Sequence, residues 1–395
     1  MNFLTAKNIL EAYKNARKSR KNKYEVYLFD QNREERLFKM LDELKKKKYV
    51  HSEYKKLILN DSKKRYISSP IFQDHILHHL VYNCIYTTLD NKMVFSSFAC
   101  RKGYGLHKGV LYLQKIIQKK QSEIKEYKQY YISKDNQIYY LKIDFSKYFF
   151  SINHTYLKEK IRKYIFDEDL LYVIDLIIDS YITDKLYDNI LKKHEFYIGE
   201  SNKGLPIGGI LSQLFANFYL NDFDQYLKHK LKVLFVRYMD DVIIIGTKNE
   251  IKKQKQNMFD FLLKEKLILH PNKISFHPIL NGVKFTGYVI KNNQIYAGKR
   301  IKSSFQKFMD KTENLDFQKL NLRLEDRKSI ISKYFSRTGC FNITNFGNNY
   351  LKQRGIIDFI RGANWNNTSN AGVFTLNLNG NAGNTNNNVG FRCAK

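Results

Sequence analysis

An apolar stretch near the middle of the chain is interrupted by two adjacent carboxylates, Asp240 and Asp241. Residues 234–236 (LFV) precede them and residues 242–245 (VIII) follow, and short runs this rich in β-branched residues are typical of strands. The sequence therefore predicts a β-hairpin with the two carboxylates at or near its bend. Two carboxylates in an apolar hairpin are costly unless their charge is compensated, which a pair of Mg²⁺ ions would do. The alternative is a solvated Asp-Asp turn.

A further acid ends a second strand-like run. Asp144 closes residues 139–144, which read YYLKID. The metal ions of a two-metal phosphoryl-transfer site lie about 3.5–4 Å apart, so such a site needs a carboxylate from a second strand. We predict Asp144, Asp240 and Asp241 as catalytic residues, and these three with Phe145 as the metal-binding set.

Other blocks occur around these carboxylates in the order found in reverse transcriptases, and the chain closely resembles that family over about residues 50 to 350. The blocks are residues 65–79 (beginning RYISSP), 96–105 (SSFACRKGYG), 144–154, 204–217 (beginning GLPIGGILSQ), 269–273 (LHPNK) and 285–288 (FTGY). One such motif would be weak evidence, whereas the ordered series is strong. One departure is His75, where many relatives carry Arg at a position that is not catalytic.

The resemblance implies an α+β, right-hand polymerase fold, with fingers, a palm of antiparallel sheet plus helices, and a helical thumb. We expect N-terminal helices and fingers in residues 1–136, palm in 137–153 and 205–296, further fingers in 154–204, thumb in 297–360 and an Asn-rich tail in 361–395. The patterns predict strands around 138–145 and 233–246 and a hairpin near 283–296. They predict helices from Ser212 to about Lys228 and from Asn249 to Lys266. A further helix is predicted over Glu34–Lys48, with Leu37, Met40, Leu41 and Leu44 on one face.

The resemblance also implies roles for other residues. Arg65 would contact the triphosphate, Phe149 would exclude a 2′-hydroxyl from beneath the sugar, and Lys273 would protonate the leaving pyrophosphate. Ile207, Gly208, Gln213 and Tyr238 complete the nucleotide-binding set, and Phe285, Gly287 and Tyr288 would hold the primer end. Two Mg²⁺ ions are the implied cofactors, for which Mn²⁺ can substitute. The alternatives are that Phe149 is ordinary core and Lys273 an ordinary surface lysine.

The block before the Asp pair indicates a particular kind of reverse transcriptase. Many bacterial members carry Gln and Pro where this chain has Ile207 and Gln213, and an aliphatic residue followed by Gln is the pattern of diversity-generating retroelements. Those systems miscopy template adenines, and the mutated cDNA replaces part of a target gene. A Gln at position 207 could hydrogen-bond near the base pair, whereas Ile offers shape only; one such contact is worth about 1–3 kcal/mol. The alternative is neutral drift in a faithful enzyme.

The end of the chain favours the same interpretation. Residues 361–367 (RGANWNN) and 389–395 (VGFRCAK) enclose an Asn-rich stretch, and both ends resemble the variable segment of C-type-lectin or formylglycine-enzyme-like target proteins. Asn codons are rich in adenine, so we interpret this end of the gene as reading into, or being, the template repeat. The alternative is an Asn-rich disordered tail.

Charge indicates the partners. Lys and Arg number 68 against 38 Asp and Glu, a formal net charge of +30, which is typical of a nucleic-acid binder. We expect template RNA, the cDNA in an RNA–DNA hybrid, and dNTPs as ligands, and the resemblance implies an oligomeric, basic accessory protein. Cys84, Cys100, Cys340 and Cys393 lack zinc or disulfide spacing, and no apolar run is long enough to span a membrane, so we expect a cytoplasmic location without membrane attachment.

Two other functions remain open on the sequence. One is a retron-type or antiphage-defence reverse transcriptase, which has the same catalytic site but no mutagenic role. The other is a non-catalytic RNA-binding or assembly protein that has kept the fold, against which the intact set of three acids argues.

Overall fold

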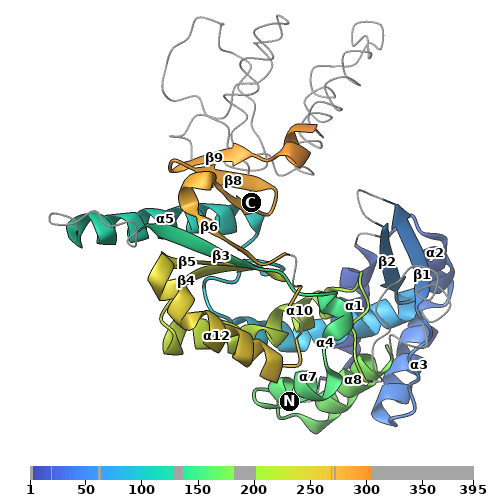
Figure 1. The fold of residues 1–395 in the computed structure, drawn as a ribbon. Helices are drawn as coiled ribbons and strands as arrows, with labels where there is room; N and C mark the ends of the chain where they lie inside the picture. The colour runs from blue at the N-terminus through green and yellow to red at the C-terminus, as the bar shows by residue number, and fades with distance from the viewer. Residues whose placement is uncertain are drawn as a thin grey trace, which may run out of the picture. The chain divides into compact units, whose positions relative to one another are not determined.

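The computed structural model describes residues 3–18, 20–60, 64–127, 137–181, 202–267, 269–270 and 273–303. The chain divides into two compact units. The first consists of Met1–Cys100, Ile143–Val233 and Lys252–Ile274, and the second of Arg101–Lys142, Leu234–Ile251 and Ser275–Lys395. Figure 1 shows the elements of both units. The predicted Asn-rich tail, and the predicted thumb beyond residue 303, lie outside the described residues.

The first unit is mainly helical. Its elements are α1 (Ala6–Arg17), α2 (Tyr24–Gln31), α3 (Arg33–Lys45), the antiparallel pair β1 (Lys55–Asn60) and β2 (Lys64–Ser69), α4 (Phe72–Asp90), α6 (Tyr148–Ser151), α7 (His154–Arg162), α8 (Glu168–Asp179), α10 (Ile210–Tyr219), α11 (Asn221–Gln225), a π-helical turn (Tyr226–Lys230) and most of α12 (Lys248–Lys264).

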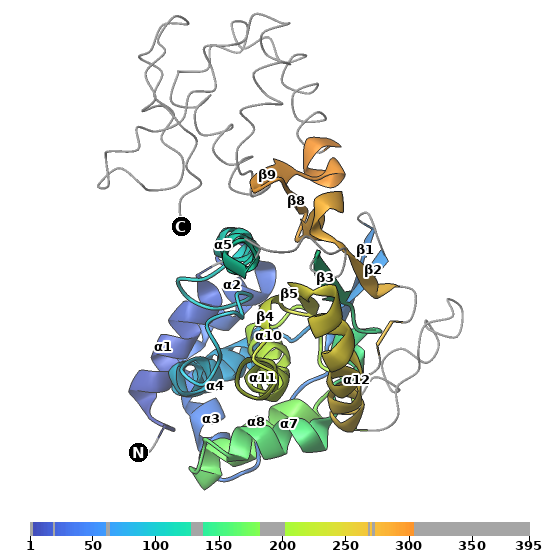
Figure 2. The same ribbon diagram turned by 60° about the vertical axis from the view of Figure 1, so that its left-hand side comes forward.

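The core of the first unit is built around α4. Most residues of this helix are buried, which is typical of a helix enclosed by protein, and α1 and α10 both pack against it (Figures 1 and 2). The predicted helix near residues 34–48 is confirmed as α3, and its four apolar residues are buried. The helix predicted from Asn249 to Lys266 is confirmed as α12.

The single helix predicted from Ser212 to about Lys228 is wrong in its continuity. Leu220 has φ −82° and ψ 0°, which ends α10, and α11 begins at the next residue. The chain then widens into a π-helical turn, in which the amide of Leu231 donates to the carbonyl of Tyr226, five residues back. The apolar period shows that a buried helix is present, but it does not show these changes of pitch.

The second unit contains two sheets and one long helix. The four-stranded sheet has the order β4 (Leu234–Tyr238), β5 (Asp241–Thr247), β3 (Ile138–Ile143) and β6 (Ser275–Pro278). Helix α5 (Leu106–Tyr127) packs against β4, and its buried residues Val110, Leu113, Ile116 and Ile117 have a spacing that places them on one helical face. The strands predicted near 138–145 and 233–246 are therefore confirmed.

The hairpin predicted near 283–296 is instead a three-stranded antiparallel meander of β7 (Val283–Phe285), β8 (Tyr288–Lys291) and β9 (Gln294–Ala297). Its second turn is formed by Asn292 and Asn293, with φ of 49° and 59°. Asn tolerates this left-handed backbone better than most residues, and two such residues make the tight turn that favours a hairpin. Among the helices of the described chain, none is long and apolar enough to cross a membrane.

Acid should weaken the fold through the histidines of α4. Burial lowers the pKa of His75 to about 3 and lowers the pKa values of His78 and His79. The unfolded chain, with ordinary histidine pKa values of about 6.5, therefore binds protons as the pH falls from 7 to 5, whereas the folded chain does not, and this favours the unfolded state. We expect the free energy of unfolding, measured in urea, to fall over this range by up to about 1.4 kcal/mol per pH unit for each histidine.

Asp74 has the opposite effect on stability. Burial raises its pKa, so as the pH falls the folded state binds this proton before the unfolded state does, which favours folding. Only one group acts in this way, against three histidines. The variant His75→Gln should show a shallower pH dependence than the unaltered chain. An unfolding free energy that is equal or higher at pH 5 than at pH 7 would contradict this account.

Candidate active site

The Asp pair lies at the bend of a hairpin, as the sequence predicts. Strands β4 and β5 are antiparallel, and Tyr238, the last residue of β4, pairs with Asp241, the first residue of β5. Met239 and Asp240 form the connection, and Met239 has a left-handed φ of 56°. A two-residue connection of this kind fits the right-handed twist of the strands.

Burial fixes the register of this hairpin. Val236 on β4 and Val242, Ile243 and Ile244 on β5 are all fully buried. Because consecutive residues are buried, both faces of the hairpin are covered, and a slip that drew the bend inward would carry the carboxylates into this apolar interior at a high desolvation cost. The apolar flanks thus hold Asp240 and Asp241 at the end of the sheet.

Arg237 is a component of the hairpin that the sequence analysis missed. Its side chain is 0% exposed, and its Nη1 donates to the carbonyl of Met239 at 3.0 Å. The bond from this buried guanidinium to Met239 fixes the turn that carries Asp240. The signal in the sequence was a charged residue inside an otherwise apolar strand.

Lys142 is a second component that the sequence analysis missed. Its Nζ lies 2.9 Å from Oδ1 of Asp241. Lys142 belongs to β3, which neighbours β5 in the sheet. A lysine two residues before Asp144 in an apolar strand was the available signal.

Asp144 belongs to the first unit, where two contacts of its own and one of its neighbour Phe145 hold it. Its carbonyl accepts from the amide of His270 at 2.9 Å, and its Oδ2 lies 3.0 Å from Nζ of Lys273. The next residue, Phe145, is buried and forms an antiparallel bridge with Leu269. The predicted site residue Lys273 therefore lies beside a predicted catalytic carboxylate.

The carboxylates suit a hard divalent cation. The side chains of Asp144 and Asp241 are 20% and 33% exposed, so each is accessible to a hydrated ion, and each is paired with a lysine. Carboxylate oxygens are the ligands that Mg²⁺ prefers. Within the ranges that the structure describes, no three His, Cys, Asp or Glu side chains are grouped closely enough to hold a metal ion. The metal-binding set, including Phe145, stays a prediction.

Phe149 lies on α6, which follows Lys147, a residue with a left-handed φ of 47°. The Phe149 side chain is half-buried, whereas its neighbour Tyr148 is buried and donates to the carbonyl of Ala216. The amide of Leu205 donates to the carbonyl of Phe149 at 2.8 Å. The block before α10 is thereby joined to the predicted sugar-screening residue.

Ile207 and Gly208 form a turn that rests on β2. The amide of Ser68 donates to the carbonyl of Ile207 at 3.0 Å. Gly208 has φ of 130°, and a Cβ at this position would lie 2.9 Å from Cγ2 of Ile67. Only glycine fits this combination of backbone and close approach. Arg65, also on β2, pairs through its backbone with Leu59.

Two side chains of α10 join this block to the one at residues 96–105. Gln213 is exposed, and its Oε1 lies 3.5 Å from Sγ of Cys100. Asn217 is buried, and its Nδ2 donates to the carbonyl of Ala99 at 2.8 Å. The first unit thus brings together four of the sequence blocks, around residues 68, 99, 149 and 207.

The predicted primer-binding residues lie in the second unit. Phe285 and Tyr288 are each 1% exposed and belong to its core. Gly287, with φ of 93°, lies in the turn between them, and its carbonyl accepts from the amide of Gly298 at 2.8 Å. The backbone of this turn, rather than the aromatic rings, is the part that could meet a primer.

Comparison with solved structures finds telomerases at low similarity. The telomerase of Candida tropicalis in complex with a fragment of telomeric RNA is 13% identical, with a TM-score of 0.46, over 77% of this chain and 55% of that chain. The apo telomerase of the same organism, truncated of its C-terminal domain, is 15% identical, with a TM-score of 0.43, over 62% and 54%.

Comparison of sequences identifies the family. Protein YkfC of Escherichia coli (strain K12) is 24% identical over 200 residues, which are 41% of this chain and 49% of that protein, so the match spans about half of the relative. The family model for reverse transcriptase (RNA-dependent DNA polymerase) matches residues 44–290, more than half of the chain. The α+β fold class expected from the sequence is confirmed, and the chain belongs to the reverse transcriptase family.

Proposed function

We propose that the chain copies a template RNA into cDNA, with Asp144, Asp240 and Asp241 as its catalytic carboxylates. The observation that carries the proposal is the Asp pair at the bend of a buried hairpin in a member of the reverse transcriptase family. The sheet adds support, because β3 neighbours β5, and Asp144 directly follows β3 while Asp241 begins β5. The net charge of +30 suits a nucleic-acid substrate.

In the proposed nucleotidyl transfer, the metal-binding residues and Lys273 have different roles. Two Mg²⁺ ions bound by Asp144, Phe145, Asp240 and Asp241 would supply Lewis-acid activation of the primer hydroxyl and charge stabilisation at the phosphorus. Lys273, which is paired with Asp144, carries the proton for the pyrophosphate that leaves.

The remaining side chains bind and select the nucleotide. Arg65 contacts the triphosphate, since a guanidinium binds phosphate through two parallel hydrogen bonds. Phe149 screens the sugar, and Gly208, Gln213 and Tyr238 shape the rest of the nucleotide site. The turn at Gly287, between Phe285 and Tyr288, supports the primer end.

Primer extension tests the proposal. The purified chain is given a DNA primer annealed to an RNA template, the four dNTPs and Mg²⁺, and the product length is measured. We expect full-length cDNA, and we expect the yield to fall steeply as salt is raised, because phosphate contacts release counterions. Failure on several templates, with RNA binding retained, would favour the non-catalytic RNA-binding alternative.

We propose further that synthesis is error-prone at template adenines and serves to diversify a target gene. Ile207 and Gln213 in the block before α10, and the Asn-rich end of the chain, support this proposal. This proposal implies that the chain works with a structured template RNA and with an oligomeric, basic accessory protein. A near-copy of the DNA encoding residues 355–395, differing almost only at adenines, should lie beside the gene; differences spread over all four bases would favour a defence or retron-type enzyme.

Ile207→Gln should raise fidelity opposite adenine. An amide at this position could hydrogen-bond near the nascent pair, and one such contact changes discrimination by about 1–3 kcal/mol, or roughly 5- to 150-fold. Errors are counted by sequencing cDNA made from a defined RNA.

The matched control for this variant is Ile207→Val, which keeps an aliphatic side chain and should keep the error pattern. An Ile207→Gln enzyme with the same adenine errors as the unaltered chain would remove Ile207 as a determinant of fidelity.

A further inference from the structure

A buried histidine of α4 faces the turn that carries Ile207 and Gly208. His78 is 1% exposed, and its Nδ1 has no hydrogen-bond partner among the described residues. This Nδ1 lies 3.6 Å from the point that a Cβ of Gly209 would occupy, and Oγ of Ser212 lies 3.2 Å from the same point. The missing side chain of Gly209 therefore leaves a small space bordered by one nitrogen and one hydroxyl.

The hydrogen bonds behind His78 define which of its nitrogens carries the proton. Nδ1 of His51 lies 2.7 Å from the carbonyl of Ser52, so it must be the donor in that bond. In a neutral ring, Nε2 of His51 is then an acceptor. Nε2 of His78 lies 3.1 Å away and must donate to it, which leaves Nδ1 of His78 as an unprotonated acceptor.

The surroundings favour this neutral arrangement. Asp74 is fully buried, accepts from the hydroxyl of Tyr49 at 2.7 Å and from the amide of Ser52 at 3.1 Å, and lies 3.7 Å from Nδ1 of His51. The Ser52 carbonyl and this carboxyl oxygen both lie on the Nδ1 side of His51, which favours a proton on Nδ1. Burial is the main effect that lowers the pKa of His78 and so opposes a positive charge on its ring.

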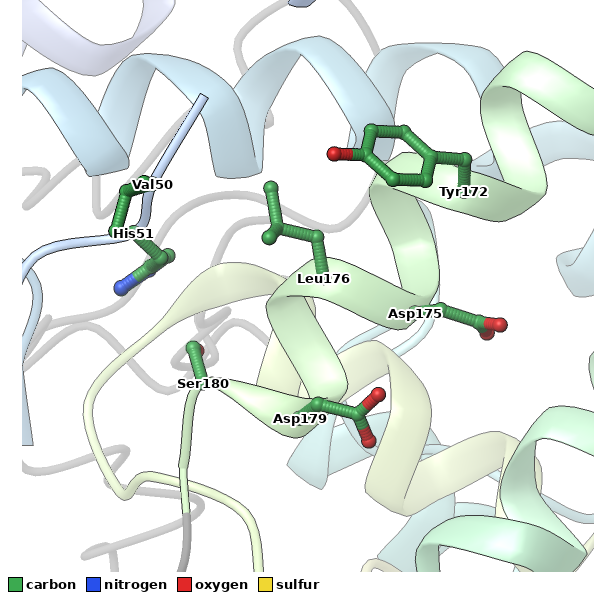
Figure 3. A pocket seen from close by; sticks show the side chains of 7 residues that line it. All are labelled: Val50, His51, Tyr172, Asp175, Leu176, Asp179 and Ser180. Carbon is green, nitrogen blue, oxygen red and sulfur yellow. The ribbon is translucent and has the colours of Figure 1, made fainter. Parts of the chain in front are cut away.

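His51 also connects this chain of bonds to a groove. It borders a groove of about 500 Å³ together with Tyr172, Leu176 and Ser180, beside helix α8 (Figure 3). His78 lies one hydrogen bond further in. An acceptor this deep costs free energy unless it is used in some state of the protein.

We propose that His78 is a positioning residue for the turn of Ile207, Gly208 and Gly209, and that its Nδ1 accepts a hydrogen bond from the Ser212 hydroxyl across the space beside Gly209. The bond forms when the turn closes on the incoming nucleotide. This inference rests on the proposed polymerase function, in which Ile207 and Gly208 belong to the nucleotide site.

Two substitutions at position 78 distinguish the role of Nδ1 from that of Nε2. The amide of His78→Gln can replace Nε2 and keep the bond to His51, but it removes the acceptor. The side chain of His78→Asn can replace Nδ1 and restore the acceptor. We expect His78→Gln and Ser212→Ala each to raise KM for dNTP about tenfold with little change in kcat, the effect of one buried hydrogen bond, and His78→Asn to recover most of the loss.

The double variant His78→Gln/Ser212→Ala tests whether the two groups act together. If they share one bond, it should be no worse than either single variant, whereas independent effects would multiply. A multiplied effect, or a KM for His78→Gln within twofold of that of the unaltered enzyme, would overturn the proposal.

The tautomer can be measured without any activity. A two-bond ¹⁵N–¹H spectrum of the full chain with ¹⁵N-labelled histidine should show an Nε2–H tautomer at pH 7 that disappears in His78→Gln. Protonation of Nδ1 in His78 would overturn the proposal even if the enzyme is active. If the unaltered chain makes no cDNA, the polymerase proposal fails, and this spectrum still decides the state of His78.

Discussion

Replacing Asp240 with Asn should abolish cDNA synthesis, with a loss of roughly a thousandfold or more in primer extension, because metal-bound charge stabilisation contributes several kcal/mol to such reactions. Asn has nearly the same shape as Asp but lacks the negative charge that binds a divalent ion. The hairpin should remain folded, since its register depends on the buried residues of β4 and β5 and not on the charge at the bend.

A matched control separates this loss from a general effect of removing a carboxylate. Asp42 lies on the exposed face of α3 and pairs with Lys46 at 2.8 Å, so Asp42→Asn should extend primers normally. Asp241→Asn should fail as Asp240→Asn does. An Asp240→Asn variant that keeps full activity would remove the Asp pair from the catalytic site.

Replacing Arg237 with Ala should produce the largest loss of stability, roughly 3–5 kcal/mol of unfolding free energy. Arg237 is among the largest fully buried side chains, so its removal leaves a cavity, and the carbonyl of Met239 loses its donor. The unfolding midpoint in urea measures the effect. Because the turn that carries Asp240 loses its support, we also expect weaker primer extension in variants that remain folded at low temperature.

The exposed lysine at position 252 of α12 provides the comparison. Lys252→Ala removes a positive charge without a cavity and should change the unfolding free energy by less than about 0.5 kcal/mol. A loss below about 1 kcal/mol for Arg237→Ala would show that the guanidinium is not an important support of the hairpin.

The sequence predicted the elements whose patterns are local and strong. The run on either side of Asp240 and Asp241 favours a buried hairpin, since its β-branched residues continue through both strands. The four apolar residues of α3 recur at helical spacing and face the protein, as expected. Asp144 was predicted because it ends a second strand-like run, and it directly follows β3, the neighbour of β5. No pattern in the residues alone shows that these two strands are neighbours.

The sequence failed where a residue depends on neighbours that are distant along the chain. Nothing near Arg237 shows that its guanidinium turns back to the Met239 carbonyl, and nothing near Lys142 shows that it meets Asp241. The partner of His78 is His51, 27 residues earlier, and the space it faces exists because residue 209 is glycine. These contacts follow from packing, which local propensity does not determine.

The most direct test of the catalytic assignment is cleavage of the chain by iron bound at the carboxylates. Fe²⁺ replaces Mg²⁺, and with ascorbate and peroxide it generates radicals that cut the backbone nearest to the ion. We predict cuts at two places, beside Asp144 and between Met239 and Asp241, both suppressed by Mg²⁺ and both lost in Asp240→Asn. Cuts at only one of these places, or cuts that persist in Asp240→Asn, would contradict a site shared by the three carboxylates.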